Sequence, residues 1–401
     1  MFKNLPLLFI FLTLTIDAIG IGLMIPVLPE LIGELTGENV AGAALWGGVL
    51  TTAFAAMQFL FGPTLGNISD RWGRRPVLLI SLAVMAGVYL VMGLTGSIWL
   101  LLIARIIAGI TAATQSTAMA YIADISSAED KAANFGLFGA AFGIGFVLGP
   151  LAGGLLGELG TRAPFYAAAV LAALNLTFGF FVLPESVTEA MRRPFSWRRA
   201  NPLGALKAVS ALPGAGGLLI FAFLTFLASV VYPAIWPYFG SERFGWGPGM
   251  IGLSLGIFGV SMAITQGVLV RPVLSRLGER NTVLLGLGLR LFSFLFLGVV
   301  GVGWLVLATT PVAALGGLED PALQGILSKR APDNAQGELQ GVMASLNAIA
   351  TIVAPLILTS VFAWFSGPDA PIYLPGAPFL IAFVLSAISA PFFLRATAAR
   401  T

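Results

Sequence analysis

Twelve long apolar segments, separated by short polar gaps, run along this chain of 401 residues. A helix needs about 20 apolar residues to cross the roughly 30 Å hydrocarbon core of a bilayer, and each segment reaches that length. We therefore expect an all-α integral membrane protein with twelve transmembrane helices. The segments are residues 5–29, 42–64, 76–95, 98–122, 134–157, 163–183, 213–238, 250–271, 282–301, 303–328, 338–365 and 374–394.

The composition indicates the same class of protein. Charged residues make up 10 % of the chain and hydrophobic residues 58 %, whereas a soluble domain carries about 25 % charged residues. The chain has no cysteine, which excludes disulfides and thiol chemistry, and no histidine, the side chain that most readily titrates near neutrality. Any proton handling must therefore use carboxylates, and we expect no metal site built by the protein alone.

Lysine and arginine residues gather in alternate polar gaps. If both termini lie inside the cell, 17 of the 21 basic residues are cytoplasmic and only Arg162 and Arg243 lie outside. Because positive residues favour the cytoplasmic side, we expect a multi-pass membrane protein with both termini in the cytoplasm. The first segment contains Asp17 and lacks a convincing small-residue cleavage site, so we expect a retained helix rather than a signal peptide.

The longest polar gap divides the chain into two sets of six segments. We expect an N-terminal six-helix bundle at 1–184, a cytoplasmic central loop at 185–212 and a C-terminal six-helix bundle at 213–401. The halves match at an offset of 205 residues, which pairs Arg71, Gly73, Arg75, Gly136 and Pro150 with Arg276, Gly278, Arg280, Gly341 and Pro355. Parallel repeats of this kind have a substrate site between them near mid-membrane.

A dense charged loop joins the second and third segments, with the pattern Gly66-x3-Asp70-Arg71-x-Gly73-Arg74-Arg75. This pattern resembles the signature loop of the major facilitator superfamily. The resemblance implies a charge relay between the loop and neighbouring helix ends that latches a cytoplasmic gate. The expected gating residues are Gly66, Asp70, Arg71, Gly73, Arg74, Arg75 and Asp124. The alternative is a solvated turn that only follows the positive-inside rule.

Two further motifs resemble those of this superfamily. Arg105-x3-Gly109 lies in the fourth segment, where an arginine costs at least about 2.5–3.5 kcal/mol and needs a partner or a cavity. The fifth segment contains Gly145-x3-Gly149-Pro150-x2-Gly153-Gly154, which resembles the motif of the antiporter branch. Small residues allow close helix approach, and proline loosens the backbone hydrogen-bond ladder. The alternatives are a structural arginine and an ordinary tight helix crossing.

Over nearly its whole length the chain is similar to bacterial tetracycline/proton antiporters. The similar stretches begin at Asp17, Met57, Tyr121, Leu183, Arg243, Leu277, Pro321 and Gln336. The resemblance implies a protein of the bacterial inner membrane that exports an amphiphilic, tetracycline-like drug in exchange for protons. The family's resistance members usually carry a histidine in the eighth helix, where this chain has Met262 or a neighbour. They also carry an acid in the ninth helix, where it has Arg290.

The depth of two charges in the membrane predicts a proton carrier. At 1.5 Å per residue, Asp17 lies about 18 Å from the cytoplasmic end of its helix, and Arg105 lies about 10 Å from the opposite face. Both therefore have about the same depth. A carboxylate beside an arginine stays ionised, whereas one desolvated without it takes up a proton. We expect Asp17 to carry the proton and Arg105 to be its electrostatic partner; a static ion pair is the alternative.

The second half has buried charges of its own. Arg290 lies about 12 Å above the cytoplasmic end of its helix, near the level of Glu319 and Asp320. We expect Arg290 to pair with one of these acids in a proton-coupling role, as a charge-swapped counterpart of the family's acidic ninth helix. The alternative is that Arg290 reaches the membrane surface alone. Five amides inside helices could bind a polycyclic drug or join helices: Gln58, Gln115, Gln266, Gln324 and Asn347.

These patterns predict a proton-coupled efflux antiporter of the major facilitator fold that works by alternating access. The alternative is a proton-coupled symporter, or an exporter of another small organic solute, on the same fold. A non-transporting receptor or lipid flippase-like scaffold is a third class. We expect no enzyme activity, no cofactor and no nucleic-acid partner, and a protein that acts as a monomer. If the cargo is a magnesium–tetracycline chelate, the magnesium ion arrives with the drug.

Overall fold

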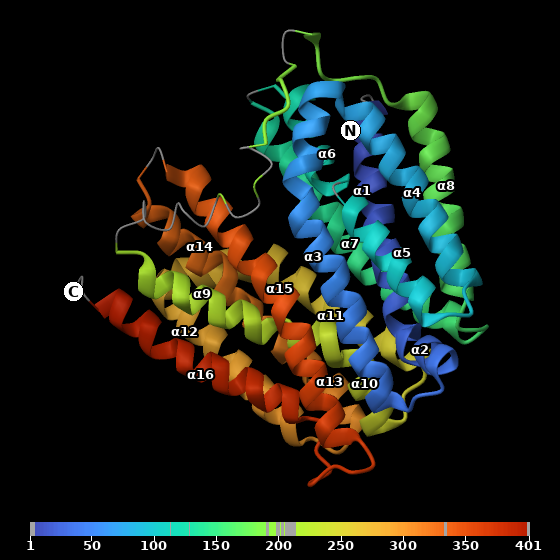
Figure 1. The fold of residues 1–401 in the computed structure, drawn as a ribbon. Coiled ribbons are helices and arrows are strands. Elements are labelled where there is room, and N and C mark those ends of the chain that lie inside the picture. The colour runs from blue at the N-terminus through green and yellow to red at the C-terminus, as the bar shows by residue number, and fades with distance from the viewer. Residues whose placement is uncertain are drawn as a thin grey trace. The chain divides into compact units, whose positions relative to one another are not determined.

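The computed structural model describes residues 5–112, 114–127, 129–189, 192–197, 201, 204, 214–332 and 335–398. The elements within these residues are helices, with no strand among them (Figure 1). The central loop is described only at 185–189, 192–197, 201 and 204. Three of its basic residues, Arg198, Arg199 and Lys207, therefore lie outside the described residues.

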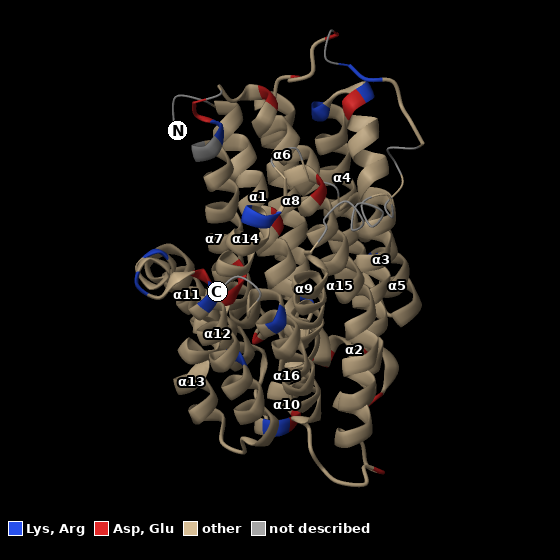
Figure 2. Cartoon of the chain, turned by 90° about the vertical axis from the view of Figure 1, so that its left-hand side faces the viewer, with Lys and Arg blue, Asp and Glu red and all other residues tan. Residues whose placement is uncertain are grey.

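The helices before the central loop are α1 (Leu5–Met24), η1 (Ile25–Val27), α2 (Leu28–Thr36), α3 (Val40–Trp72), α4 (Arg74–Leu94), α5 (Ile98–Thr111), α6 (Thr114–Ile125), α7 (Lys131–Gly157) and α8 (Ala163–Val182). Those after it are α9 (Gly216–Ser229), α10 (Val231–Phe244), α11 (Pro248–Ile264), η4 (Thr265–Leu269), α12 (Val270–Val299), α13 (Gly303–Leu315), η5 (Gly316–Leu318), α14 (Glu319–Arg330), α15 (Gln336–Ser366) and α16 (Ala377–Ala398). Figure 2 shows that Lys, Arg, Asp and Glu occupy only a small part of the helices.

Ten stretches of the described residues are long and apolar enough to cross a membrane, and the two missing from the predicted twelve lie in the second half. One stretch, Pro248–Val299, has 52 residues, or about 78 Å of helix. It therefore covers two predicted segments, 250–271 and 282–301. Gly278 lies between them, and its φ of 71° interrupts the helix there. The predicted segment 303–328 forms α13, η5 and α14, and its adjacent acids Glu319 and Asp320 make it less apolar.

Contacts divide the chain into two compact units. The first unit is Met1–Gly37, Ala53–Pro202 and Gly247–Gly256, and the second is Glu38–Thr52, Leu203–Trp246 and Ile257–Thr401. The first part of α3 thus belongs to the second unit, and the first part of α11 belongs to the first. The boundaries at 184 and 213 that the polar gap suggests stay a prediction.

In the first unit, glycines of α7 allow its backbone to approach α1 closely. A Cβ atom on Gly149 would lie 2.8 Å from the carbonyl oxygen of Ile19, and one on Gly153 would overlap the carbonyl of Leu23. On the other side of α7, a Cβ atom on Gly154 would lie 2.6 Å from the carbonyl oxygen of Pro248, at the start of α11. The glycine motif of the fifth segment therefore forms tight helix crossings, and its role in antiport stays a prediction.

The second unit is built on large apolar side chains. Helix α9 packs on α15 and α16, and α12 packs on α14 and α16. Phe221 of α9 and Phe393 of α16 are both fully buried, with ring centroids 5.0 Å apart. In a bilayer, the close van der Waals contact between such rings contributes to helix packing. This core fixes the positions of α12 and α14, which carry the buried charges of this unit.

Gly153→Ala should destabilise the protein, because the new methyl group would overlap a backbone carbonyl of α1 that cannot rotate aside. Overpacking of this kind costs about 1–3 kcal/mol. Gly143→Ala is the matched control: it lies in the same helix, and no atom lies within 4 Å of its Cβ position. In detergent, the unfolding temperature of Gly153→Ala should be lower than that of the unsubstituted protein. The unfolding temperature of Gly143→Ala should be the same or higher. Equal unfolding temperatures for the two variants would contradict the tight crossing.

Candidate functional site

A cavity of about 250 Å³ lies inside the first unit. Asp17 of α1 and Arg105 of α5, the two buried charges predicted for this half, both line it. Gln58 of α3 and Gln115 of α6 line it too. The rest of the wall is mostly apolar and includes Met24, Phe54, Met85, Tyr89, Met92 and Phe142. Four predicted site residues from four helices thus share one cavity.

Arg105 is held against an aromatic ring. Its guanidinium carbon lies 4.4 Å from the ring centroid of Phe54, a cation–π contact worth about 2 kcal/mol when the cation is desolvated. The side chains of Asp17 and Arg105 face the same cavity, where opposite charges attract more strongly than in water. The cavity and the ring meet the requirement that an arginine at this depth has suitable surroundings.

Tyr89 of α4 is a cavity residue that the sequence does not single out. It is buried, and its hydroxyl lies so close to α1 that a Cβ atom on Gly20 would come within 2.6 Å of it. The hydroxyl is also within electrostatic range of both Asp17 and Arg105. The sequence gives one indication that a side chain packs here. Gly20 lies three residues after Asp17, so both are on the same face of α1, and the glycine leaves space on that face.

The other three predicted amides belong to the second unit. Gln266 donates from Nε2 to the carbonyl oxygen of Gly317 at 2.9 Å, so it joins two helical segments. Gln324 is half-buried in α14, and Asn347 is exposed on α15. Contact of these three side chains with a substrate stays a prediction.

Gln266 and Gly317 both lie where the helices depart from α geometry. Gln266 belongs to η4, a π-helix, and Gly317 belongs to η5, a 3-10 helix. π-Helical turns inside α-helices often occur at functional sites. The hydrogen bond between the two residues holds these irregular segments together.

Arg290 of α12 lies between both acids that the sequence offers as its partners. Its Nη1 atom is 3.5 Å from Oε1 of Glu319, and its Nη2 atom is 3.7 Å from Oδ1 of Asp320. The side chain of Glu319 is completely buried, that of Arg290 is 9 % exposed and that of Asp320 is 58 % exposed. The pairing is therefore present with two acids instead of one. The alternative of a lone arginine at the membrane surface is wrong.

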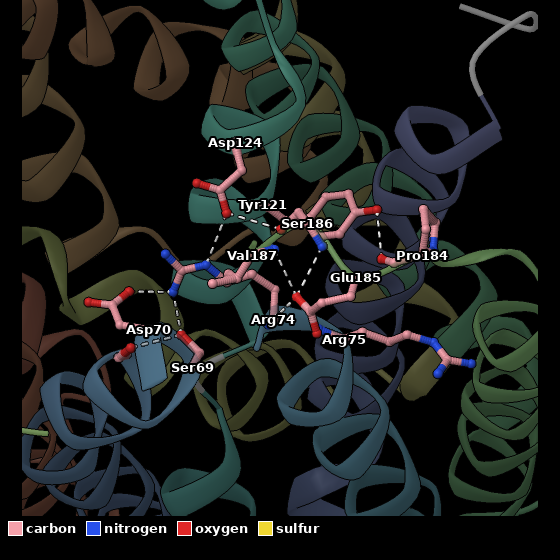
Figure 3. Close-up of polar contacts among 11 residues, drawn as sticks. Ser69, Asp70, Arg74, Arg75, Tyr121, Asp124, Pro184, Glu185, Ser186 and Val187 are labelled. Atoms are coloured by element: carbon pink, nitrogen blue, oxygen red, sulfur yellow. Dashed lines mark hydrogen bonds and ion pairs between the residues drawn. The ribbon is translucent and has the colours of Figure 1, made fainter. Parts of the chain in front are cut away.

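Arg74 is the centre of the charged loop between α3 and α4. Its Nη1 atom lies 2.6 Å from Oδ1 of Asp70 and donates to Oγ of Ser69, also at 2.6 Å. Its Nε atom donates to Oδ2 of Asp124 in α6 at 3.3 Å. Figure 3 shows the guanidinium between the two carboxylates. Three predicted gating residues, Asp70, Arg74 and Asp124, thus form one network.

The other predicted residues of the loop lie around this network. Arg75 donates from Nη2 to the carbonyl oxygen of Phe180 in α8 at 2.8 Å, and Figure 3 shows its side chain directed away from Arg74. Arg71 is exposed, and the carbonyl oxygen of Gly66 accepts the hydroxyl of Ser69 at 2.8 Å. Arg75 therefore joins the loop to α8, whereas Arg74 joins it to α6.

Glu185, at the start of the central loop, has a structural role that the sequence does not predict. Its carboxylate accepts the backbone N–H groups of Arg74 at 2.8 Å and Arg75 at 3.2 Å, and also those of Ser186 and Val187 (Figure 3). The first N–H groups of a helix lack intrahelical partners and favour a negative group. Glu185 therefore caps the N-terminus of α4.

Gly73 allows this cap to form. Its φ of 110° lies in the region that favours glycine, and a Cβ atom at this position would overlap the carboxylate of Glu185. The central loop makes two further hydrogen bonds to the end of α3. The backbone N–H of Arg193 donates to the carbonyl oxygen of Asp70 at 3.2 Å, and Nδ2 of Asn67 donates to the carbonyl oxygen of Ser196 at 2.6 Å. The described part of the central loop is thus bound to the charged loop.

The acidic residues of these clusters could also be considered as metal ligands. Among the described residues, no group of three or more carboxylates is placed to hold a metal ion. With no histidine or cysteine in the chain, the network of Asp70, Arg74 and Asp124 and the cluster of Arg290, Glu319 and Asp320 are ionic assemblies in which arginine supplies the positive charge.

The chain has close relatives among characterised bacterial proteins. It is 42 % identical over 361 residues to the class C tetracycline resistance protein of Escherichia coli, an alignment that covers 90 % of each chain. It is 39 % identical to the class G tetracycline resistance protein of Vibrio anguillarum, over 88 % of this chain and 89 % of the relative. Both alignments extend through the two halves.

Solved structures of transporters share the fold. The human organic anion transporter TETRAN is 27 % identical, with a TM-score of 0.65 and coverage of 96 % of this chain and 99 % of that one. A nucleoside transporter gives a TM-score of 0.78 over 98 % of each chain. At 15 % identity this second likeness shows the fold alone.

The family is established by the whole chain. Residues 10–233 and 218–400 each match the model of the Major Facilitator Superfamily. The apolar helices and the bacterial relatives support a multi-pass protein of the inner membrane. With its all-α fold and its paired matches to the family model, this chain belongs to the Major Facilitator Superfamily and is a transporter rather than an enzyme.

Proposed function

We propose that this protein is a proton-coupled antiporter that exports a small amphiphilic drug, tetracycline-like, across the inner membrane by alternating access. The observation that carries the proposal is the cavity of the first unit, which Asp17 and Arg105 both line from helices long and apolar enough to cross a membrane. The similarity to tetracycline resistance proteins supplies the class of cargo.

Asp17 is the proposed proton carrier. Near Arg105 its carboxylate is favoured in the charged form, and when the arginine's field weakens or water leaves the cavity, the neutral acid is favoured because a lone charge in lipid is costly. Asp17 would then take a proton on one side and release it on the other. Arg105, held against Phe54, supplies the fixed positive charge.

The cavity wall suits part of an amphiphilic ring system. Two amides, Gln58 and Gln115, lie among methionine and phenylalanine side chains, which is the mixture typical of drug sites. Its volume of about 250 Å³ is below the roughly 300–1,000 Å³ of sites for drug-sized ligands. The two amides would therefore bind one portion of the cargo. The remaining proposed contacts, Gln266, Gln324 and Asn347, belong to the second unit.

The network around Arg74 is the proposed inner gate. Asp70, Arg74 and Asp124 would form its latch, with Gly66, Arg71, Gly73 and Arg75 shaping the loop and Glu185 capping α4. The glycine motif (Gly145, Gly149, Pro150, Gly153 and Gly154) would allow α7 to pivot on its close contacts, because proline removes one backbone hydrogen bond from the helix. The proposed moving bodies are the six-helix bundles 1–184 and 213–401, joined by the loop 185–212.

The proposed orientation has both termini in the cytoplasm, and the proposed working form is a monomer. Protons and the cargo are the partners, and magnesium would enter only as part of a drug chelate. An exporter of another amphiphilic solute is a second candidate, favoured by Met262 and Arg290 at positions where the resembling resistance proteins usually carry a histidine and an acid. A susceptibility panel on cells that make this protein separates the two: resistance to other drugs without resistance to tetracycline favours the second.

Asp17→Asn should abolish proton-driven export, because the amide matches the acid in size but carries no exchangeable acidic proton. In proteoliposomes, a proton gradient should drive tetracycline against its concentration gradient with the unsubstituted protein and not with the variant. Asp369→Asn, an exposed carboxylate in the loop before α16, is the matched control and should transport normally. Full gradient-driven export by Asp17→Asn would remove Asp17 from the mechanism.

Glu185→Ala should lower the stability of the protein, because the first N–H groups of α4 lose their cap. Loss of an N-terminal cap costs about 0.5–2 kcal/mol. Glu189→Ala, an exposed glutamate four residues further along, should leave the unfolding temperature unchanged. Thermal unfolding of the two purified variants in detergent measures the difference. Equal unfolding temperatures for Glu185→Ala and Glu189→Ala would show that Glu185 does not stabilise α4 as a cap.

A further inference from the structure

The cluster of Arg290, Glu319 and Asp320 in the second unit does not balance its charges. One guanidinium lies between two carboxyl groups, at 3.5 Å from Glu319 and 3.7 Å from Asp320. With both acids ionised, the cluster carries one excess negative charge inside a helical segment of the membrane. A buried charge without compensation is strongly unfavourable, so the excess has to be removed by a bound positive species.

The two acids differ in their surroundings. The side chain of Asp320 is 58 % exposed, whereas that of Glu319 is completely buried. Only Glu319 has a carboxyl that protein encloses completely, so an uncompensated charge is most unfavourable there, and Asp320 is the acid left to neutralise Arg290. The buried carboxyl of Glu319 is therefore the group at which the excess charge is removed.

Glu319 also lacks the hydrogen bonds that would hold it as an anion. Neither of its carboxyl oxygens has a hydrogen-bond partner among the described residues. Thr225 lies beside it, but its hydroxyl donates to the carbonyl oxygens of Phe221 and Ala222 in its own helix, at 3.1 and 3.0 Å. Without such hydrogen bonds, a buried carboxylate is far less favourable than a neutral carboxyl, because its charge is desolvated.

The local packing holds Glu319 at ion-pair distance from Arg290. A Cβ atom on Gly286 of α12 would lie 2.7 Å from the backbone nitrogen of Glu319, so the start of α14 rests directly on α12. The distances from Arg290 to both acids exceed the roughly 2.7–2.9 Å of a charge-assisted hydrogen bond. Arg290 is therefore placed to move toward either acid.

The helices around the cluster are interrupted. Glu319 follows directly on the 3-10 helix η5, whose Gly317 is bonded to Gln266 in the π-helix η4. Interrupted helices of this kind form coupling-ion sites in transporters. A metal cation is disfavoured here, because the arginine repels it and a hard cation needs about six oxygen ligands. A proton needs only one carboxyl oxygen.

We propose that Glu319 is a second proton-binding site, separate from Asp17, and that Arg290 moves between Asp320 and Glu319 as this proton arrives and leaves. When the transport cycle opens the site to water and the O–H bond of Glu319 breaks, its proton passes to that water and Arg290 turns to the new carboxylate. When a proton returns from water, Arg290 turns back to Asp320. This inference rests on the proposed proton coupling and deepens it: one site in each unit gives two exchangeable protons.

Infrared titration of the purified protein, with no drug present, tests the site directly. A protonated carboxylic acid has a carbonyl stretching band that is distinct from the bands of carboxylates and amides. Glu319→Gln should remove one such band, and Asp17→Asn should remove a different one. Asp320→Asn should make the Glu319 band disappear at a lower pH, because Arg290 then has only Glu319 to neutralise. Glu338→Gln, an exposed glutamate of α15, is the control and should leave the protonated-acid region unchanged. A spectrum of Glu319→Gln identical to that of the unsubstituted protein would overturn the proposal.

Two further measurements keep the test decisive. If Glu319→Gln does not fold, as judged by gel filtration, Glu319→Asp retains an acid and should shift the band instead of removing it; an unshifted band would overturn the proposal. In proteoliposomes with tetracycline and magnesium, the proton-to-drug ratio should fall by one in Glu319→Gln, and an unchanged ratio would also count against it. Absence of tetracycline transport by the unsubstituted protein would contradict the proposed function alone, because the infrared bands do not depend on the drug.

Discussion

A charge inside a membrane has to be compensated by its immediate surroundings, since lipid supplies neither water nor counterions. This chain meets the requirement differently in its two units. In the first, Arg105 lies against Phe54 and shares a cavity with Asp17. In the second, Arg290 lies between Glu319 and Asp320. The first arrangement leaves open space next to the charges and the second packs them closely. The chemistry proposed for both follows from this difference.

Close helix packing is what brings these groups together. Gly149 and Gly153 let α7 meet the backbone of α1, and Gly20 leaves space for the Tyr89 hydroxyl near Asp17. Gly286 lets the start of α14 rest on α12 beside Arg290. Association of helices in a bilayer depends on such contacts, because apolar side chains gain little by leaving lipid. The glycines therefore allow the close helix contacts that position the buried charges.

Charges are also compensated in the charged loop between α3 and α4. Arg74 connects Asp70 with Asp124, while Glu185 neutralises the N-terminus of α4. These contacts join α3, α4, α6 and the central loop at one place. Such ionic contacts near water are weaker than buried ones and are more easily broken and remade. This property suits the proposed latch, which would open in every transport cycle.

The sequence alone determined the membrane class, most of the spans and the charged loop, because apolar length and charge placement follow directly from the chemistry of lipid. The comparison with known proteins then established the family. Only the tertiary structure decided that Arg290 contacts two acids, that Tyr89 joins the cavity and that Glu185 caps α4. It also showed the break at Gly278 and the bond from Gln266 to Gly317. These features depend on which residues distant in sequence come into contact, and helical periodicity carries no information about that.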